Sequence, residues 1–239
     1  MTANAFPTLR RTALLLTVLV SMGHSALPDE RPDQLPAVEG RRDGAAETIR
    51  LPPPTLRGER SLEEALARRR SVREFTDERL SDADVGQLLW AAQGITHDRG
   101  SRTAPSAGAL YPLELYAATV DGLFHYEPQA HRLVRRASRD LRPTIAKAAL
   151  SQDAVRSAPL LVVMTAVYER TAVKYGDRAA RYVHMEAGHS AQNVLLQAAA
   201  LGLGAVPVGA FDDAALARAL TLADEERPLY ILPVGRPRD

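Results

Sequence analysis

Apolar and polar residues recur with a helical period where the globular part of the chain begins. Ser61-Leu62-Glu63-Glu64 fits a capping box, in which a serine hydroxyl and a glutamate carboxylate satisfy the free N–H groups of a helix start. Ser81 opens a second segment in the same way, and the apolar positions within 85–92 recur at the spacing of one helix face. The sequence therefore predicts one helix up to about Arg69 and another that ends at Gly94.

Apolar runs without helical spacing predict strands further along the chain. Leu113–Val120 and Leu123–Tyr126 flank Asp121-Gly122, which predicts a β-hairpin with a type I′ turn. The almost wholly apolar run from Pro159 to Val167 predicts a strand buried on both faces. The other expected elements are helices over 140–150 and 151–157, a long alanine-rich helix from about Arg178 to Leu201, a strand over 205–211, a helix from Asp212 to Leu220 and a strand over 229–234. Because strands and helices alternate, we expect an α+β or α/β domain of about 180 residues.

The N-terminal segment has a pattern typical of export. Arg10-Arg11 precedes an apolar run over 12–20, and small residues follow, which together predict a secretory signal over residues 1–25. The arginine pair also fits a twin-arginine signal, so we expect export to the periplasm, with an N-terminal membrane anchor as the alternative. The run is short for a bilayer span, so no stable span is expected once the signal is removed. Proline-rich residues 26–57 predict an extended linker, and the domain then covers 58–239.

Composition narrows the classes of function. The 239 residues include no cysteine, which excludes disulfides, thiolate metal sites, iron–sulfur clusters and a cysteine nucleophile. A net charge of +1, from 30 basic and 29 acidic residues, argues against a nucleic-acid binder, which usually shows a clear basic excess. Lys147 and Lys174 are the two lysines of the chain, so a lysine beside a site motif is informative, whereas a single arginine is weak support for any site.

Three segments are candidates for ligand binding. Arg69-Arg70-Ser71-Val72-Arg73 suits a phosphate, because each guanidinium can donate two parallel hydrogen bonds; a solvated basic helix end is the alternative. Small residues between two prolines over 104–112 predict a rigid loop whose backbone can approach a flat ligand, or a structural loop that enters the hairpin. Gly202–Gly209 follows a helix and carries Pro207 in place of a third glycine, so it fits a helix stop and a ligand-bordering strand better than a dinucleotide fingerprint.

The long helix contains residue types that often bind metal ions, but their spacing does not suit a metal site. His184 and His189 are about 140° apart around a helix, so they cannot share a metal ion. Glu186 and His189 form one half of a di-iron motif that has no second copy in the chain. We therefore expect these two residues to form a helix-packing pair, and we expect no metal site.

Taken in order, these segments resemble the nitroreductase-like flavin family. The matching motifs are Arg69-Arg70-Ser71-Val72-Arg73, the Pro105–Pro112 loop, Glu186-Ala187-Gly188-His189 with Gln192-Asn193, Gly202–Gly209 and Leu232–Gly235. The loop and the Glu-Ala-Gly-His helix resemble the SagB-type branch, which includes dehydrogenases that oxidise azolines to thiazoles and oxazoles. The resemblance spans about residues 61–237. It implies an α+β fold with a central mixed β-sheet surrounded by helices, and long central helices at a homodimer interface that binds FMN.

The resemblance also implies site residues. Arg69, Arg70, Ser71 and Arg73 would bind the flavin phosphate and ribityl chain; Ser106, Ala107 and Gly108 would line the ring; Pro207, Val208 and Gly209 would border its other edge; and Arg236 would add a phosphate contact. Lys174 and Tyr175 match a Lys-Tyr pair that azoline dehydrogenases place beside the flavin. There the lysine would accept a proton while hydride leaves to the flavin, and the tyrosine would help to polarise the substrate. A surface lysine near a helix start is the alternative.

These expectations combine into an FMN-dependent oxidoreductase that transfers hydride through the flavin and acts on a small molecule or a peptide heterocycle. One alternative is an NAD(P)H-dependent nitro or quinone reductase, which export disfavours because NAD(P)H is scarce outside the cytoplasm. A non-catalytic exported flavin-binding protein is another, and an accessory subunit in peptide modification a third. A redox partner or NAD(P)H would be the electron donor, and no nucleic acid is expected as a partner.

Overall fold

The computed structural model describes residues 47–238. The expected signal and most of the expected linker lie outside this range. The strands are β1 (Thr48–Arg50), β2 (Leu113–Thr119), β3 (Gly122–Glu127), β4 (Arg132–Ala137), β5 (Leu160–Val167), β6 (Gly204–Ala205) and β7 (Glu226–Gly235). The helices are α1 (Leu62–Arg68), α2 (Asp82–Gln93), α3 (Arg142–Ala148), α4 (Asp153–Ser157), α5 (Tyr168–Tyr175), α6 (Ala179–Ala200) and α7 (Asp213–Leu220), with 3-10 turns at Ala107–Ala109 and Gly176–Arg178.

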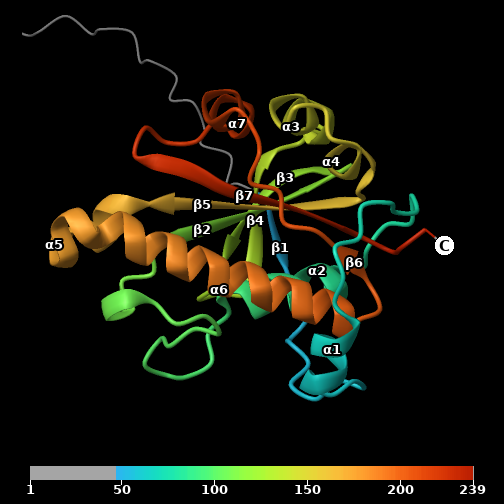
Figure 1. Cartoon of the computed structure of the whole chain (residues 1–239), viewed down its shortest axis with the longest axis horizontal. Helices are drawn as coiled ribbons and strands as arrows, with labels where there is room; N and C mark the ends of the chain where they lie inside the picture. Colours follow the sequence, from blue (N-terminus) through green and yellow to red (C-terminus); the bar gives the residue numbers. More distant parts are fainter. Residues whose placement is uncertain (1–46, 239) are drawn as a thin grey trace, which may run out of the picture. The chain divides into compact units, whose positions relative to one another are not determined.

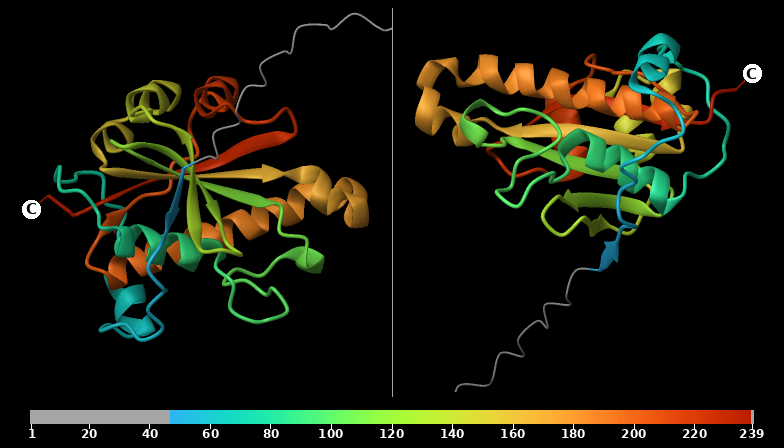
Figure 2. Two further views of the ribbon diagram at one scale, coloured as in Figure 1. Left: turned by 180° about the vertical axis from the view of Figure 1, so that it is seen from behind. Right: turned by 90° about the horizontal axis from the view of Figure 1, so that it is seen from below.

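A seven-stranded sheet in the order β1-β4-β3-β2-β5-β7-β6 forms the centre of the domain (Figure 1). Helices α2 and α6 cover one face, with α1 packed against α6, and α3, α4 and α7 cover the other face (Figures 1 and 2). The expected α+β class is confirmed. The paired strands are all antiparallel rather than mixed, because the chain reverses direction at each turn or helical connection between neighbours. A parallel bridge joins Ser71 to Ala205 outside these pairs.

The capping boxes predicted at the starts of α1 and α2 both form. The Ser61 hydroxyl accepts a hydrogen bond from the backbone N–H of Glu64, and the Glu64 carboxylate accepts one from the N–H of Ser61. Ser81 and Asp84 form the same reciprocal pair at α2. β5 is buried along almost its whole length, as its apolar run predicts.

Helix α6 is the element that spans the domain. It begins at Ala179 and ends at Ala200, and Figure 2 shows it lying along one face of the sheet. The Arg60 guanidinium donates to the carbonyls of Ala199 and Ala200, both at 2.9 Å, and so satisfies two free acceptors at the helix end. Gly202 then turns the chain away with a φ of +75°.

Two local expectations are corrected by the structure. The β2–β3 hairpin forms, but its turn is not type I′, because neither Val120 nor Asp121 has the positive φ that this turn requires. The strand expected over 205–211 shortens to β6, followed by a separate bridge between Val208 and Ile231. Pro207 has no N–H to donate to a continuous ladder, which explains the interruption.

The sheet reaches further toward the N-terminus than residue 58. Backbone pairs join Thr48 to Val134 and Arg50 to Arg132, so β1 becomes an edge strand next to β4. Leu51 is only 3% exposed and belongs to the core on the α2 and α6 side. Residues 48–51 are therefore part of the globular unit, although their proline-rich surroundings resemble a linker.

Candidate functional site

Arginines gather at the C-terminal end of α6. Arg60, Arg68, Arg69 and Arg70 line a cavity of about 420 Å³ that also includes Ala199 and has no acidic residue in its lining. Among residues 47–238, no ion pair neutralises Arg68, Arg69 or Arg70. Guanidinium groups without an acidic partner suit an anionic ligand such as a phosphate. Arg60 and Arg68 were not predicted as site residues, although the uninterrupted run of three arginines from Arg68 was a signal for the latter.

The predicted phosphate motif is held in place by a close backbone approach. Val72 N–H donates to Ala205 C=O at 3.1 Å. A Cβ at Gly204 would lie 2.6 Å from Cβ of Val72, so only glycine allows this contact. Beyond it Arg73 faces a different cavity, of about 560 Å³, which Val208 also lines. The structure thus brings Arg69 and Arg70 together and places Arg73 with Val208.

The other predicted residues near this end have different surroundings. Ser71, Pro207 and Gly209 are exposed. Arg236 lies in an ion pair with Glu78, with 2.7 Å between Nε and Oε1, and this hydrogen bond raises the pKa of Arg236. The charge of Arg236 is therefore already balanced within the chain.

The loop over 104–112 meets the end of α5. Gly108 has a φ of +64°, and a Cβ there would lie 3.1 Å from Oη of Tyr175 and 3.2 Å from Nζ of Lys174. The Lys174 Nζ also lies 5.5 Å from the centroid of the Tyr175 ring. The structure therefore brings together two motifs, Ser106–Gly108 and Lys174-Tyr175, that are 66 residues apart in sequence at Gly108 and Lys174.

These two groups of predicted residues lie toward opposite ends of α6 (Figure 1). The Ser106 hydroxyl interacts with Glu186 in the first half of the helix, whereas Ala199 lines the arginine cavity near its end. Thirteen residues of helix separate Glu186 from Ala199, which corresponds to about 20 Å. Within one chain, the arginine cavity and the loop therefore meet α6 at separate positions along its length.

A buried polar cluster lies between the loop and α2. Glu186 is 2% exposed and Gln93 is fully buried. The Arg102 Nη1 donates to Gln93 Oε1 at 2.9 Å. Burial raises the pKa of Glu186 to about 7, against the opposing effects of the Ser106 hydroxyl, the Arg102 charge and the Gln93 amide. Glu186 is thus a carboxyl group that can hold a proton near neutral pH.

The expected packing pair of Glu186 and His189 is not formed, because Glu186 is buried and His189 is exposed. Glu186 instead belongs to the buried stripe of α6 with Val183 and Ser190, and the Ser190 hydroxyl donates to Ala92 C=O at 2.9 Å. This i, i+3, i+7 spacing was readable in the sequence and would have placed the glutamate in the core.

A second polar group borders the same loop. Glu114 accepts from His125 Nε2 and Arg170 Nη2, both at 2.6 Å, and Arg170 also bonds the carbonyl of Tyr111. Burial alone would raise the pKa of Glu114, but the hydrogen bonds from His125 and Arg170 lower it overall. These residues and Arg102 line a cavity of about 280 Å³. Within residues 47–238, no three histidine or acidic side chains are grouped so that they could hold a metal ion.

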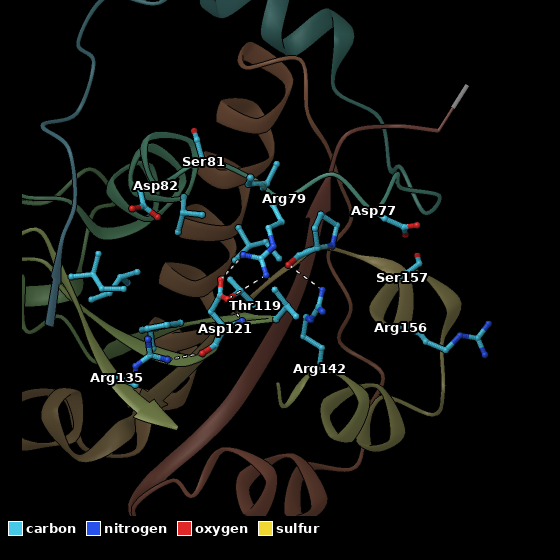
Figure 3. A pocket seen from close by; sticks show the side chains of 18 residues that line it. Asp77, Arg79, Ser81, Asp82, Thr119, Asp121, Arg135, Arg142, Arg156 and Ser157 are labelled. Carbon is cyan, nitrogen blue, oxygen red and sulfur yellow. Dashed lines mark hydrogen bonds and ion pairs between the residues drawn. The ribbon is translucent and has the colours of Figure 1, made fainter. Parts of the chain in front are cut away.

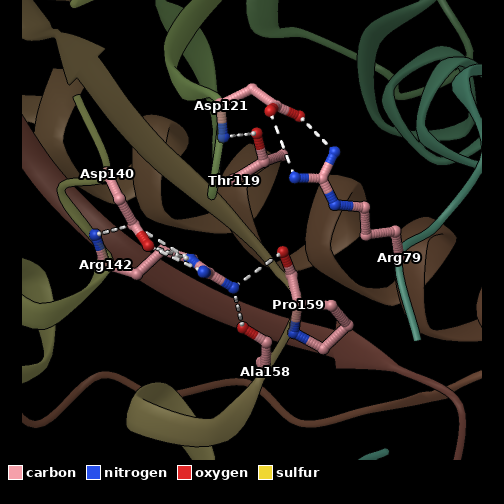
Figure 4. Close-up of polar contacts among 7 residues, drawn as sticks. All are labelled: Arg79, Thr119, Asp121, Asp140, Arg142, Ala158 and Pro159. Atoms are coloured by element: carbon pink, nitrogen blue, oxygen red, sulfur yellow. Dashed lines mark hydrogen bonds and ion pairs between the residues drawn. The ribbon is translucent and has the colours of Figure 1, made fainter. Parts of the chain in front are cut away.

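A larger cavity, of about 700 Å³, contains none of the predicted site residues (Figure 3). It lies between the start of α2, the β2–β3 turn and Pro159. Figure 4 shows that its arginines have partners: Arg79 pairs with Asp121 at 3.2 Å, and Arg142 pairs with Asp140 at 2.7 Å. No charge on Arg79 or Arg142 is left free for an anionic ligand, so this cavity is a weaker candidate than the arginine cavity.

Comparison with known proteins matches residues 66–236 to the Nitroreductase family. The chain belongs to this family. A protein of Methanocaldococcus jannaschii named as a nitroreductase is 46% identical over 181 residues, which cover 73% of this chain and 90% of that protein. A nitroreductase-named structure from Ralstonia eutropha is 31% identical with a TM-score of 0.73, and the match covers 82% of this chain and 92% of that chain.

A more distant likeness is to a chain of the Escherichia coli microcin synthetase complex with a truncated pro-microcin bound. That chain is 26% identical with a TM-score of 0.64, and the match covers 72% of this protein and 70% of that chain. Family membership indicates an oxidoreductase with the nitroreductase fold.

Proposed function

We propose that the protein is an FMN-dependent oxidoreductase that exchanges hydride with a small molecule or a peptide heterocycle. The observation that carries this proposal is the arginine cavity, whose lining contains several guanidinium groups and no carboxylate. Such a cavity fits the phosphate of FMN, and the family to which the chain belongs is built for redox chemistry. When bound, the flavin supplies the hydride transfer, and the protein supplies binding and orientation.

Each group of residues has a distinct task in this proposal. Arg69 and Arg70 hold the phosphate, and the Ser106–Gly108 loop borders the flavin ring. Lys174 lies against that loop through Gly108, so its amine is placed to accept a proton from a substrate that gives up hydride. The likeness to a chain of a microcin synthetase complex with a truncated pro-microcin bound supports a peptide as the substrate class.

A second copy of the chain is part of the proposal. Glu186, beside the loop, and Ala199, in the arginine cavity, are about 20 Å apart along α6. We infer that a partner chain brings its own loop to the arginines. The exposed face of α6 supports such contact: Gly188 stands in mid-helix, a Cβ there would meet nothing within 4 Å, and Met185 is 47% exposed. Glycine costs an exposed helix about 1 kcal/mol relative to alanine, which is explained if another helix approaches there.

The FMN site is tested by replacing Arg69 and Arg70 together with alanine and measuring FMN affinity by fluorescence quenching. Loss of two charge-assisted contacts, each worth about 1.5–3 kcal/mol, should weaken binding by at least about 100-fold. The double variant Arg99→Ala with Arg218→Ala removes the same charge from exposed positions and should retain the parental affinity. Equal affinities of the two double variants would contradict the site.

The role of Lys174 is tested by Lys174→Ala. Anaerobic bleaching of the flavin by an azoline-containing peptide should slow by about 10²- to 10⁴-fold with FMN binding unchanged, because a general base contributes a factor of this size. Lys147 is the other lysine, is exposed on α3, and provides the matched control Lys147→Ala. Unchanged bleaching in Lys174→Ala would leave the lysine without a catalytic role.

An NAD(P)H-dependent nitro or quinone reductase is the second candidate, favoured by the names of the Methanocaldococcus and Ralstonia relatives. Bleaching of the flavin by NADPH and not by an azoline peptide would select it. We propose from their sequence pattern that residues 1–25 direct export. Because NAD(P)H is scarce outside the cytoplasm, export favours an electron donor other than NAD(P)H. A flavoprotein that neither donor reduces would fit the non-catalytic alternative.

A further inference from the structure

Ser106 stands where the flavin-facing loop begins, with part of its hydrogen-bonding capacity already committed. Its Oγ accepts a hydrogen bond from the backbone N–H of Tyr111 at 2.9 Å, across the loop. A serine hydroxyl has one proton and two lone pairs. One lone pair is therefore used by the loop itself, and the proton and the second lone pair remain for other partners.

Three buried polar atoms near Ser106 lack a regular hydrogen-bond partner. They are Glu186 Oε1, Gln93 Nε2 and Arg102 Nε, and within residues 47–238 the fourth such atom is in Thr76, elsewhere in the domain. Buried polar groups are normally paired, so a cluster of unpaired ones usually has a function or an exchanging proton. The proton transfer proposed for Lys174 uses none of these three side chains.

We propose that Glu186 is a positioning residue that sets whether Ser106 offers a donor or an acceptor to the flavin ring. The ionised carboxylate accepts a hydrogen bond from the Ser106 hydroxyl and leaves Ser106 only a lone pair for the ligand. The protonated carboxyl group donates to that lone pair instead and turns the hydroxyl proton toward the ligand. The inference rests on the proposed function, because the ligand is FMN.

The surroundings of Glu186 determine when it changes state. Arg102, before the loop, is the charged group that acts on Glu186, and α2 contributes the neutral Gln93. Arg102 itself is influenced by Tyr111 in the loop, Glu114 on β2 and Arg170 on α5. Burial raises the pKa of Glu186 to about 7, so both states are populated near neutral pH. Flavin oxygens accept hydrogen bonds and flavin N–H groups donate them, so the state of Ser106 matters for binding.

The first test needs no flavin. The side-chain carboxyl ¹³C signal of Glu186 in the apo-protein, assigned by its loss in Glu186→Gln, should titrate with a midpoint near 7. In Ser106→Ala the midpoint should rise, because the Ser106 hydroxyl favours the ionised form. Ser106→Thr keeps a hydroxyl at an extended backbone position and should restore the parental midpoint. A midpoint that is the same in all three proteins would overturn the coupling.

The second test measures FMN affinity between pH 5.5 and about 8.5, a range chosen to bracket the carboxyl titration. The dissociation constant should change more steeply with pH in the parent and in Ser106→Thr than in Glu186→Gln and Ser106→Ala, where only the FMN phosphate, with a second pKa of about 6, still titrates. His189→Gln removes a titratable side chain from the exposed face of the same helix and should retain the parental profile. If the FMN dissociation constant of Ser106→Ala changes with pH as steeply as that of the parent, the inference is overturned. Absence of FMN binding to the parent overturns the proposed function, and the apo-protein titration still decides the coupling.

Discussion

At the scale of single residues, Glu186 departs furthest from what its residue type favours. A glutamate is seldom fully buried without a partner, yet this one is 2% exposed and has an unpaired Oε1. Burial disfavours the charged form, and the single Arg102 charge nearby does not offset it. The domain therefore carries an internal group whose charge is costly above neutral pH.

The cost has a sign that can be tested. The pKa of Glu186 is raised from 4.5 to about 7 in the folded protein, so its contribution to stability is present in full below pH 4.5 and is lost as the pH rises through 7. Glu186→Gln cannot ionise and avoids this loss. The unfolding free energy of Glu186→Gln, relative to that of the parent, should therefore increase as the pH rises. The increase should reach about 3 kcal/mol above pH 7.

Urea unfolding of the apo-protein at several pH values measures this gain. His189→Gln is the control, since it removes a titratable side chain from the same helix but from an exposed position. Parallel pH profiles for Glu186→Gln and the parent would show that the carboxyl group is not held in its neutral form.

At the scale of elements, the sequence predicts best where local chemistry decides the structure. The capping boxes at Ser61 and Ser81 need only four residues each, and both form as expected. The strand from Leu160 to Val167 is buried on both faces, so a continuous apolar run was enough to find it. Asp212 likewise caps α7 by accepting from the N–H of Ala215.

Elements that depend on distant partners were harder to predict. β1 has three residues, too few for their alternation to indicate a strand, and it forms because β4 offers it a free edge. β4 itself is rich in arginine, since its position next to the sheet edge leaves much of it partly exposed. α5 follows the buried strand β5 without a capping residue, so no local signal marked its start.

At the scale of the whole molecule, sequence motifs identified candidate residues but not their arrangement. The resemblance implies an FMN site at a homodimer interface that includes Arg69, Ser106, Lys174 and Val208, but it does not say which of them meet within one chain. The fold joins Ser106–Gly108 to Lys174 at one end of α6 and keeps the arginines at the other. Which motifs meet depends on where the 22-residue helix α6 packs in the domain. The local sequence of each motif does not indicate that position.

The proposed dimer makes a prediction that a site within one chain cannot satisfy. If each site combines the arginines of one chain with the loop of its partner, Arg69→Ala/Arg70→Ala and Gly108→Val should each fail to bind FMN as homodimers. Valine at Gly108 is excluded by its φ of +64° and by the nearby Lys174 and Tyr175. In a mixed dimer of the two variants, the intact loop of the first chain meets the intact arginines of the second, so one site is restored.

Co-expression with two different affinity tags isolates the mixed dimer, and the absorbance of bound flavin gives its FMN content. The composite site requires one FMN for each mixed dimer and none for either homodimer. A site within each chain requires none in all three proteins, because every chain then carries one disabled half. A monomeric parent that binds FMN would reject the composite arrangement outright, since the arginines and the loop would have no partner chain through which to meet.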